Sequence, residues 1–190
     1  MQLLEDRIAS DGIIKQGDVL KVDRFLNHQM DVFLFSQMAE EWYRLFGDEN
    51  VNKILTIEAS GIGLACIAGL KFGCPVVFAK KSKTSNMSPD VYHARVHSYT
   101  HGTTHDVTVA REYLLPTDRV LLIDDFLANG EAMAGLISLC RQAGAKVIGA
   151  GIAIEKAYQP GGKRIREMGV RVESLARIES MDPETGFRFC

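Results

Sequence analysis

Short apolar runs alternate with helical stretches through the middle of the chain, and this alternation most limits what the chain can fold into. The run at residues 120–123 is apolar without a break, and residues 132–143 place apolar side chains at the helical period. Strands that are apolar on both faces need cover on both sides, which strand–helix–strand units provide. The sequence therefore predicts an α/β fold, a single domain with a doubly wound, mostly parallel sheet. The predicted strands are 53–57, 75–79, 120–123 and 147–154, and the predicted helices are 31–46, 62–72 and 132–143.

The chain length and the charge balance exclude several classes of protein. With 190 residues there is room for one full-sized domain. Its 22 basic and 24 acidic residues leave a net charge of -2, so we expect no nucleic-acid partner and no anionic membrane surface as partner. Charged residues among the first twelve positions argue against a secretory signal, and no apolar run approaches the length of a bilayer span.

The four cysteines indicate a reducing compartment. Cys66, Cys74, Cys140 and Cys190 are far apart and lack the spacing of a metal site or a redox pair. Cys66 and Cys140 fall on apolar faces of predicted helices, so we expect both to be buried. We therefore expect a reduced, cytoplasmic protein.

The segment 120–132 concentrates the groups that could do chemistry. A predicted buried strand ends in Asp124 and Asp125, a short turn with Gly130 follows, and a helix then begins. In open parallel sheets, ligands bind beyond the carboxyl ends of the strands, and the start of a helix offers free N–H groups to a phosphate. Two carboxylates beside such a site would repel a bare phosphate, but they suit a ligand that also carries hydroxyls or a developing positive charge. A ribose phosphate has both properties.

This segment resembles the phosphoribosyl pyrophosphate (PRPP) motif of the type I phosphoribosyltransferases, which has four apolar residues, two acidic ones, two apolar ones and a glycine turn. The resemblance implies that Asp124 and Asp125 are catalytic and hold the ribose hydroxyls. The alternative is a strand that ends in solvated acids before an ordinary turn. The residues that would wrap the 5-phosphate are Ala128, Asn129, Gly130, Glu131 and Ala132.

A second glycine-containing loop, 58–63, follows the predicted strand 53–57 and opens a helix. In the family the loop at this position binds pyrophosphate through its backbone amides, which would involve Ser60 and Gly61. Tight packing of the helix on the strand is an equally good reading. The resemblance also implies Mg²⁺, bound mainly through the pyrophosphate of PRPP rather than by protein ligands, with Lys80 or Lys81 nearby.

Three residues are candidates for contact with a purine base. Lys156 follows the strand 147–154, and in 6-oxopurine members of the family a lysine at this position reads the 6-oxo group; the alternative is a solvated surface lysine. The stretches 19–29, 126–130 and 171–178 resemble bacterial xanthine phosphoribosyltransferases. By that resemblance Leu20 covers the purine face and Asn27 reads the 2-oxo edge, although Asn27 also fits a turn.

The resemblance implies transfer of the phosphoribosyl group from PRPP to xanthine by a homodimer. It also implies a small hood over the base, made of about residues 1–30 and 170–190. The alternatives are a hypoxanthine/guanine enzyme of the same family and a non-catalytic regulator that senses PRPP. One departure is clear: some 6-oxopurine members have an aspartate, thought to handle the purine proton, where this chain has Ala128. Alanine cannot transfer a proton, so the group that does so is unassigned.

The long polar stretch from about residue 80 to 106 is expected to act as a lid, with a hairpin at 92–109. Lid residues that could reach the pyrophosphate are Lys81, Lys83, Ser98 and Tyr99, and an uninvolved solvated hairpin is the alternative. Histidines recur at every fourth position in this stretch, but on a strand they would share one face with Arg95, which disfavours a cation site. These histidines, expected to be exposed, are His93, His97, His101 and His105.

Overall fold

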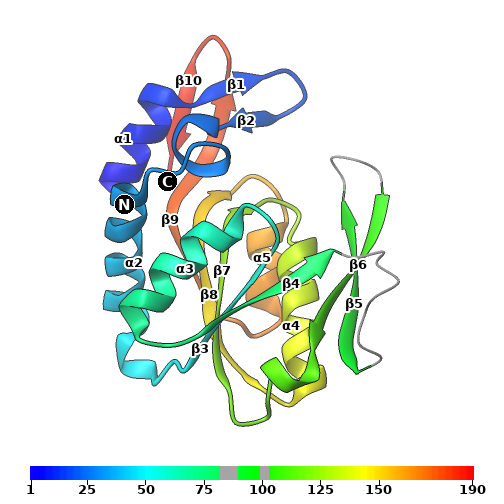
Figure 1. The fold of residues 1–190 in the computed structure, drawn as a ribbon. Coiled ribbons are helices and arrows are strands. Elements are labelled where there is room, and N and C mark those ends of the chain that lie inside the picture. The colour runs from blue at the N-terminus through cyan, green and yellow to red at the C-terminus, as the bar shows by residue number, and fades with distance from the viewer. Residues whose placement is uncertain (82–89, 99–102) are drawn as a thin grey trace.

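A computed structural model describes residues 1–81, 90–98 and 103–190 of the chain, with side chains described at all of these except 98 and 103 (Figure 1). Its helices are α1 (Gln2–Asp11), α2 (Val32–Phe46), α3 (Gly61–Phe72), α4 (Glu131–Ala143) and α5 (Gly161–Glu167), with short turns η1 (Asp23–Asn27), η2 (Gly47–Glu49) and η3 (Arg111–Tyr113). Its strands are β1 (Ile13–Lys15), β2 (Val19–Lys21), β3 (Lys53–Ile57), β4 (Val76–Lys81), β5 (Val91–Ser98), β6 (Thr103–Ala110), β7 (Arg119–Leu127), β8 (Lys146–Lys156), β9 (Val172–Asp182) and β10 (Gly186–Phe189).

One large sheet forms the centre of the molecule, with the strand order β10-β9-β8-β7-β3-β4-β6-β5. The five strands from β9 to β4 are parallel, while β10, β6 and β5 pair antiparallel with their neighbours. The predicted doubly wound, mostly parallel sheet is therefore confirmed. Among the described residues, no helix combines the length and the apolar character needed to cross a membrane.

Helices cover both faces of this sheet and create two separate hydrophobic cores. Leu121 and Ile123 pack with α2 and α3, whereas Leu122 packs with α4 on the opposite face (Figure 1). This alternation explains why residues 120–123 of β7 are apolar without a break. Helix α2 begins as predicted, because the carboxylate of Asp31 accepts a hydrogen bond of 3.0 Å from the amide of Leu34 and caps the helix.

The direction of winding reverses between β3 and β7. From β3 the chain passes through α3 to β4 on one side, whereas from β7 it passes through α4 to β8 on the other side. Loops that leave two adjacent strands in opposite directions leave a crevice at the carboxyl end of the sheet, and ligands of open α/β sheets bind there. The two loops at this position are 58–60 and 128–130.

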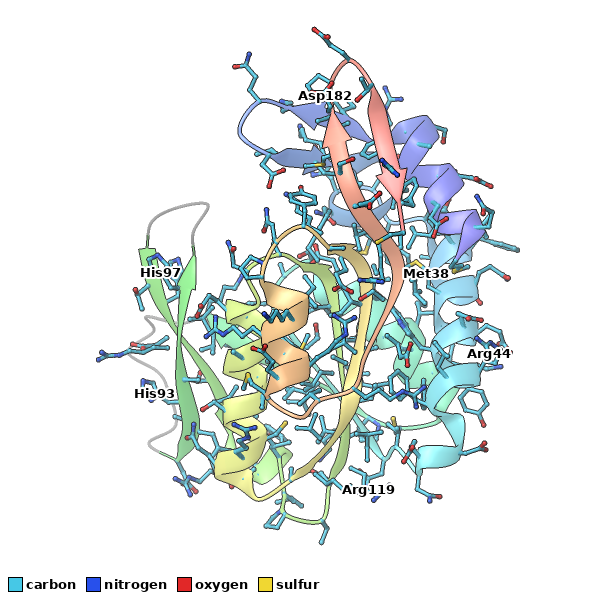
Figure 2. All side chains as sticks on the ribbon, turned by 180° about the vertical axis from the view of Figure 1, so that it is seen from behind. Met38, Arg44, His93, His97, Arg119 and Asp182 are labelled. Atoms are coloured by element: carbon cyan, nitrogen blue, oxygen red, sulfur yellow. The ribbon has the colours of Figure 1, made fainter. Side chains whose placement is uncertain are left out.

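Both ends of the described chain meet above this edge of the sheet. Helix α1 contacts β9 and β10, and the hairpin β1–β2 and the turn η1 lie in the same region (Figures 1 and 2). In Figure 2, Asp182 marks the far tip of the β9–β10 hairpin. We call the group formed by residues 1–30 and 172–190 the hood.

Two central strands are longer than predicted. Strand β7 continues through Asp124 and Asp125 to Leu127, and β8 continues through Glu155 to Lys156. They extend together because Phe126 and Leu127 remain paired with Ile154 and Glu155. The prediction that these acids and the lysine follow their strands is therefore wrong, since sheet pairing overrides the change to polar residues.

The prediction that Cys66 is buried is also wrong. The buried face of α3 is formed by Leu64, Ala65, Ala68 and Gly69, and Cys66 lies just beyond that face and is exposed. Gly69 sets the rotation of the helix, because a Cβ atom there would lie 2.4 Å from a methyl group of Val76. Cys140 on α4 is buried as predicted, and burial raises the pKa of its thiol to about 12.

Candidate functional site

Two adjacent carboxylates occupy the centre of the carboxyl edge of the sheet. Asp124 is 4% exposed and Asp125 is 8% exposed. The Asp125 amide donates a hydrogen bond of 3.0 Å to Asp124 Oδ1, and the Phe126 amide donates one of 2.9 Å to Asp125 Oδ1. Burial raises the pKa of Asp124 well above its usual range, and the neighbouring charge of Asp125 raises it further. Buried neighbouring carboxylates with a raised pKa are often found at functional sites.

The loop after β3 lies directly against these acids. A Cβ atom on Gly61 would come within 2.1 Å of Thr56 Oγ1 and 3.2 Å of Asp124 Oδ1. Ser60 stands at the N-cap of α3, so the first amides of that helix are free of intrahelical acceptors. The structure thus brings the Ser60–Gly61 loop and Asp124 together, as the sequence predicts. It also satisfies the alternative of tight helix–strand packing, because the two readings require the same close approach.

The turn after β7 is held in place by a close contact between two glycines. Gly130 has a φ of +80°, in the left-handed region that favours glycine, and its backbone faces that of Gly161. The Gly161 amide donates a hydrogen bond of 2.9 Å to the Ala128 carbonyl, and a Cβ atom on Gly161 would lie 2.2 Å from that oxygen. The turn is therefore fixed by backbone contacts to the start of α5.

This turn and the start of α4 line a pocket of about 390 Å³. Its lining residues are Lys81, Val96, His97, His105, Val107 and residues 126–133, which include the predicted phosphate-binding residues Ala128, Asn129, Gly130, Glu131 and Ala132. Helix α4 begins at Glu131, so its first N–H groups and the positive end of its dipole are at this pocket. The carboxylate of Glu131 pairs with Arg164, which offsets its charge next to an anion site.

Lys156 is buried and held by the hood. It is 8% exposed, its Nζ donates to the backbone carbonyl of Asp18, and the same nitrogen lies 3.6 Å from Asp18 Oδ2. The alternative of a solvated surface lysine is therefore wrong. The adjacent Glu155 points to the other side of β8, where Arg166 and Ser174 hydrogen-bond to it.

Leu20 and Asn27 lie in the hood, in different surroundings. Leu20 on β2 is buried in the core that includes α2, whereas Asn27 ends η1 and is exposed. The chain after Asn27 reaches the loop site, because a Cβ atom on Gly63 would meet the sulfur of Met30 at 2.6 Å. No hydrogen bond joins Asn27 to Lys156 among the described side chains; the N-terminal part of the hood reaches Lys156 through Asp18.

The predicted hairpin is present as β5–β6 and packs on α4. Tyr92, Ala94 and Val96 are buried on one face, as the alternation predicts, and a Cβ atom on Gly135 would touch Val96 at 2.5 Å. His93 lies on the other face with its ring 3.2 Å from the carboxylate of Asp106 (Figure 2). Figure 2 shows His97 further along the same hairpin. Of the other residues suggested for the lid, Lys83, Tyr99 and His101, together with the side chain of Ser98, lie outside the described part of the chain.

Three residues of the site were missed in the sequence. Thr56 is fully buried against Gly61, and its hydroxyl has no hydrogen-bond partner among the described residues. Gly161 supports the turn 128–130, and Asp18 contacts Lys156. The glycines after Pro160 and the glycine before Asp18 are visible turn signals, but their partners are more than thirty residues away, so only the fold reveals them.

Comparison with known proteins gives a consistent relationship. Residues 21–175 match the family model described as a phosphoribosyl transferase domain. A xanthine phosphoribosyltransferase of Lachnoclostridium phytofermentans is 57% identical over 186 residues, covering 98% of this chain and 96% of that protein. One from Bifidobacterium longum subsp. infantis is also 57% identical, covering 98% and 97%. The fold is similar to that of the APRTase from Giardia lamblia complexed with 9-deazaadenine, with a TM-score of 0.80, 23% identity, and coverage of 93% of this chain and 98% of that one.

Proposed function

Because the chain belongs to the phosphoribosyltransferase family, we propose that it transfers the 5-phosphoribosyl group of PRPP to xanthine, giving xanthosine 5'-monophosphate and pyrophosphate. The observation that carries this proposal is the pair of buried carboxylates, Asp124 and Asp125, on β7 directly before the turn and helix start that line a pocket. A ribose phosphate needs both features, hydroxyl acceptors on one side and N–H donors on the other. The choice of xanthine is supported by the names of relatives more than half identical to this chain.

In this proposal the 5-phosphate of PRPP is bound by the turn and helix start at 128–132. Asn129 adds an amide donor to the backbone N–H groups. Arg164 offsets the charge of Glu131, so the carboxylate adds less repulsion than a free one would. The close contact of Gly130 with Gly161 keeps the turn in one conformation before the ligand arrives, which reduces the entropy lost on binding.

The reaction breaks the bond from the ribose anomeric carbon to pyrophosphate as a ring nitrogen of the base attacks that carbon. Positive charge develops on the ribose, and we assign its stabilisation to Asp124 and Asp125. Negative charge develops on pyrophosphate, beside the Ser60–Gly61 amides and Lys81. The protein works by positioning and electrostatics, without a covalent intermediate.

The carboxylates also suit a magnesium ion that arrives with the substrate. Among the described residues, no group of three or more His, Cys, Asp or Glu side chains forms a cage for a metal. Mg²⁺ is commonly bound through one or two carboxylates together with substrate phosphates, which two adjacent aspartates can supply. When bound, it would neutralise part of the pyrophosphate charge.

We assign the base to the space between β8 and the hood. Lys156 would donate to the 6-oxo group, which excludes adenine because its amino group is a donor there. Leu20 would cover the purine face and Asn27 would read the 2-oxo group. We propose that the protein is a homodimer in the cytoplasm. There the four cysteines of each chain, all free in this structure, would stay reduced.

The test is to measure nucleotide formation from PRPP, in the presence of Mg²⁺, with xanthine, hypoxanthine, guanine and adenine supplied in turn. We expect xanthine to have the highest kcat/KM and adenine to give no nucleotide. Asp125→Asn should lower kcat about 100-fold or more without unfolding the protein, because the charge opposite the ribosyl cation is lost. The control is Asp48→Asn, an exposed carboxylate in η2 at the opposite edge of the sheet. Preference for hypoxanthine or guanine would reassign the base, and full activity of Asp125→Asn would refute the site.

A non-catalytic regulator that senses PRPP predicts a different outcome. Such a protein would bind PRPP without releasing pyrophosphate in the presence of any purine. It would also shift nucleic acid in a gel, with strong salt dependence. The net charge of -2 disfavours this alternative.

A further inference from the structure

The turn between β1 and β2 ends at Asp18, which forms hydrogen bonds with residues at the carboxyl end of β8 and just after it. Asp18 has a φ of +63°, and both its carbonyl and its carboxylate reach the carboxyl end of β8. There the Asp18 carbonyl accepts from Lys156 Nζ, and its carboxylate accepts from Gln159 Nε2 and, at 2.5 Å, from the Tyr158 hydroxyl. One residue of the hood therefore bonds to three of the four residues 156–159, all except Ala157.

These contacts constrain the group that is proposed to read the purine. A lysine ammonium is carried on a flexible four-carbon chain and has three N–H donors and no acceptor. The Asp18 carbonyl uses one donor, and Asp18 Oδ2 lies 3.6 Å from the same nitrogen. The remaining donors are thereby limited to a few directions, and a carbonyl group of a ligand can accept from them.

The carboxylate of Asp18 is itself held by two donors. Burial and the hydrogen bond to Asp18 raise the pKa of Tyr158, so its hydroxyl keeps its proton and remains a donor at neutral pH. Gln159 bonds to the other carboxylate oxygen. The position of Asp18 therefore depends on the core, and the start of β2, with Leu20 two residues later, depends on Asp18.

We propose that Asp18 is a positioning residue for the purine: it orients the Lys156 ammonium toward the 6-oxo group and fixes the β1–β2 turn, with Leu20, over the base. This inference rests on the proposed function, since it assigns the base to Lys156. It identifies a specificity determinant that does not itself need to touch the substrate.

Steady-state kinetics of variants at three positions test this role. Asp18→Gly removes the carboxylate but keeps the carbonyl and tolerates the positive φ, whereas Asp18→Asn keeps an acceptor for Tyr158 and removes the charge. We expect Asp18→Gly to raise the KM for xanthine about tenfold, with a smaller rise for Asp18→Asn and for Tyr158→Phe. The KM for PRPP should change less than about twofold, because the phosphate turn is not contacted. Glu184→Gln, an exposed residue on the β9–β10 hairpin of the hood, is the matched control.

A double-mutant cycle separates positioning from general stabilisation of the hood. If Asp18 acts in part through Lys156, Asp18→Gly should raise the xanthine KM by a smaller factor in a Lys156→Ala background than in the wild-type protein, and the remaining rise measures its effect through the β1–β2 turn and Leu20. Additive effects, an unchanged or lower xanthine KM in Asp18→Gly, or an equal rise in the PRPP KM would overturn the proposal. If the wild-type protein used a different oxopurine, the same cycle with that base would test Asp18. Absence of turnover with every base would instead refute the proposed function itself.

Discussion

A single methyl group at residue 61 should separate the proposed catalytic role of the loop after β3 from its structural role. Gly61 has no positive φ, so alanine fits its backbone conformation, and the effect of Gly61→Ala is purely steric. The new carbon would lie 2.1 Å from Thr56 Oγ1. The two atoms must move apart by roughly 1 Å to reach ordinary contact, and Thr56 is fully buried on β3, so the loop must move.

The magnitudes predict a large loss of activity and a small loss of stability. Inserting a methyl group into a packed site costs about 1–3 kcal/mol. Alanine recovers about 1 kcal/mol relative to glycine in a helix, which leaves about 0–2 kcal/mol, or a fall in Tm of at most roughly 8 °C for a chain of this size. A displacement of about 1 Å at a reacting centre, in contrast, costs about 100-fold in rate.

Substitutions of Thr56 provide the test. Nucleotide formation and thermal unfolding should be measured for Gly61→Ala alone and combined with Thr56→Ala or Thr56→Val. Thr56→Ala removes the obstructing oxygen and should restore most of the rate, whereas Thr56→Val keeps a group of the same size there and should not. Near-normal activity of Gly61→Ala, or equal rescue by both substitutions, would refute the steric reasoning.

Three further substitutions give testable predictions. Because burial raises the pKa of Asp124, its ionisation opposes folding at neutral pH. Asp124→Asn should therefore raise Tm at pH 7 while turnover is lost. The difference in Tm between the two proteins should vanish as the pH falls towards 3.8, the unperturbed pKa. Gly161→Ala, whose methyl group would meet the Ala128 carbonyl at 2.2 Å, should raise the KM for PRPP about tenfold and leave that for xanthine nearly unchanged; equal changes in both would contradict a local effect. Burial raises the pKa of Glu155, but hydrogen bonds from Arg166 and Ser174 outweigh it and leave that pKa lowered, so Arg166→Ala should cost about 1–3 kcal/mol at neutral pH in a denaturant titration. That cost should shrink as the pH falls through the pKa of Glu155, and a constant cost would show that the ion pair does not matter.

The order of strands and helices could be predicted from the sequence because it depends on local periodicity. The apolar positions of 132–143 and the cap at Asp31 lie close together in the sequence, so they indicate α4 and α2 directly. Strand ends could not be predicted in the same way. Polar residues normally end a strand, but Asp124, Asp125 and Lys156 stay in the sheet because their neighbours remain paired.

The candidate site was predictable where its members are close in sequence. The acids and the turn 128–132 belong to one segment, and the structure places them together with Gly61 at the point where the winding reverses. Contacts between distant segments left no local signal. The bond between Asp18 and Lys156 spans 138 residues, and nothing in the composition of either segment specifies the other.

The placement of both acids within β7 has a consequence for how such a protein could change its substrate. Asp124 pairs with Ile152 of β8, and Asp125 lies between this pair and the pair Phe126–Ile154, so amide hydrogens of this stretch should exchange with solvent more slowly than those of the β1–β2 turn. The residues assigned to the sugar thus belong to the central sheet, while Leu20 and Asn27, assigned to the base, lie in the N-terminal part of the hood, outside that sheet. Mutations in that part of the hood could therefore change which purine is bound and leave the proposed bond-breaking site on β7 unchanged.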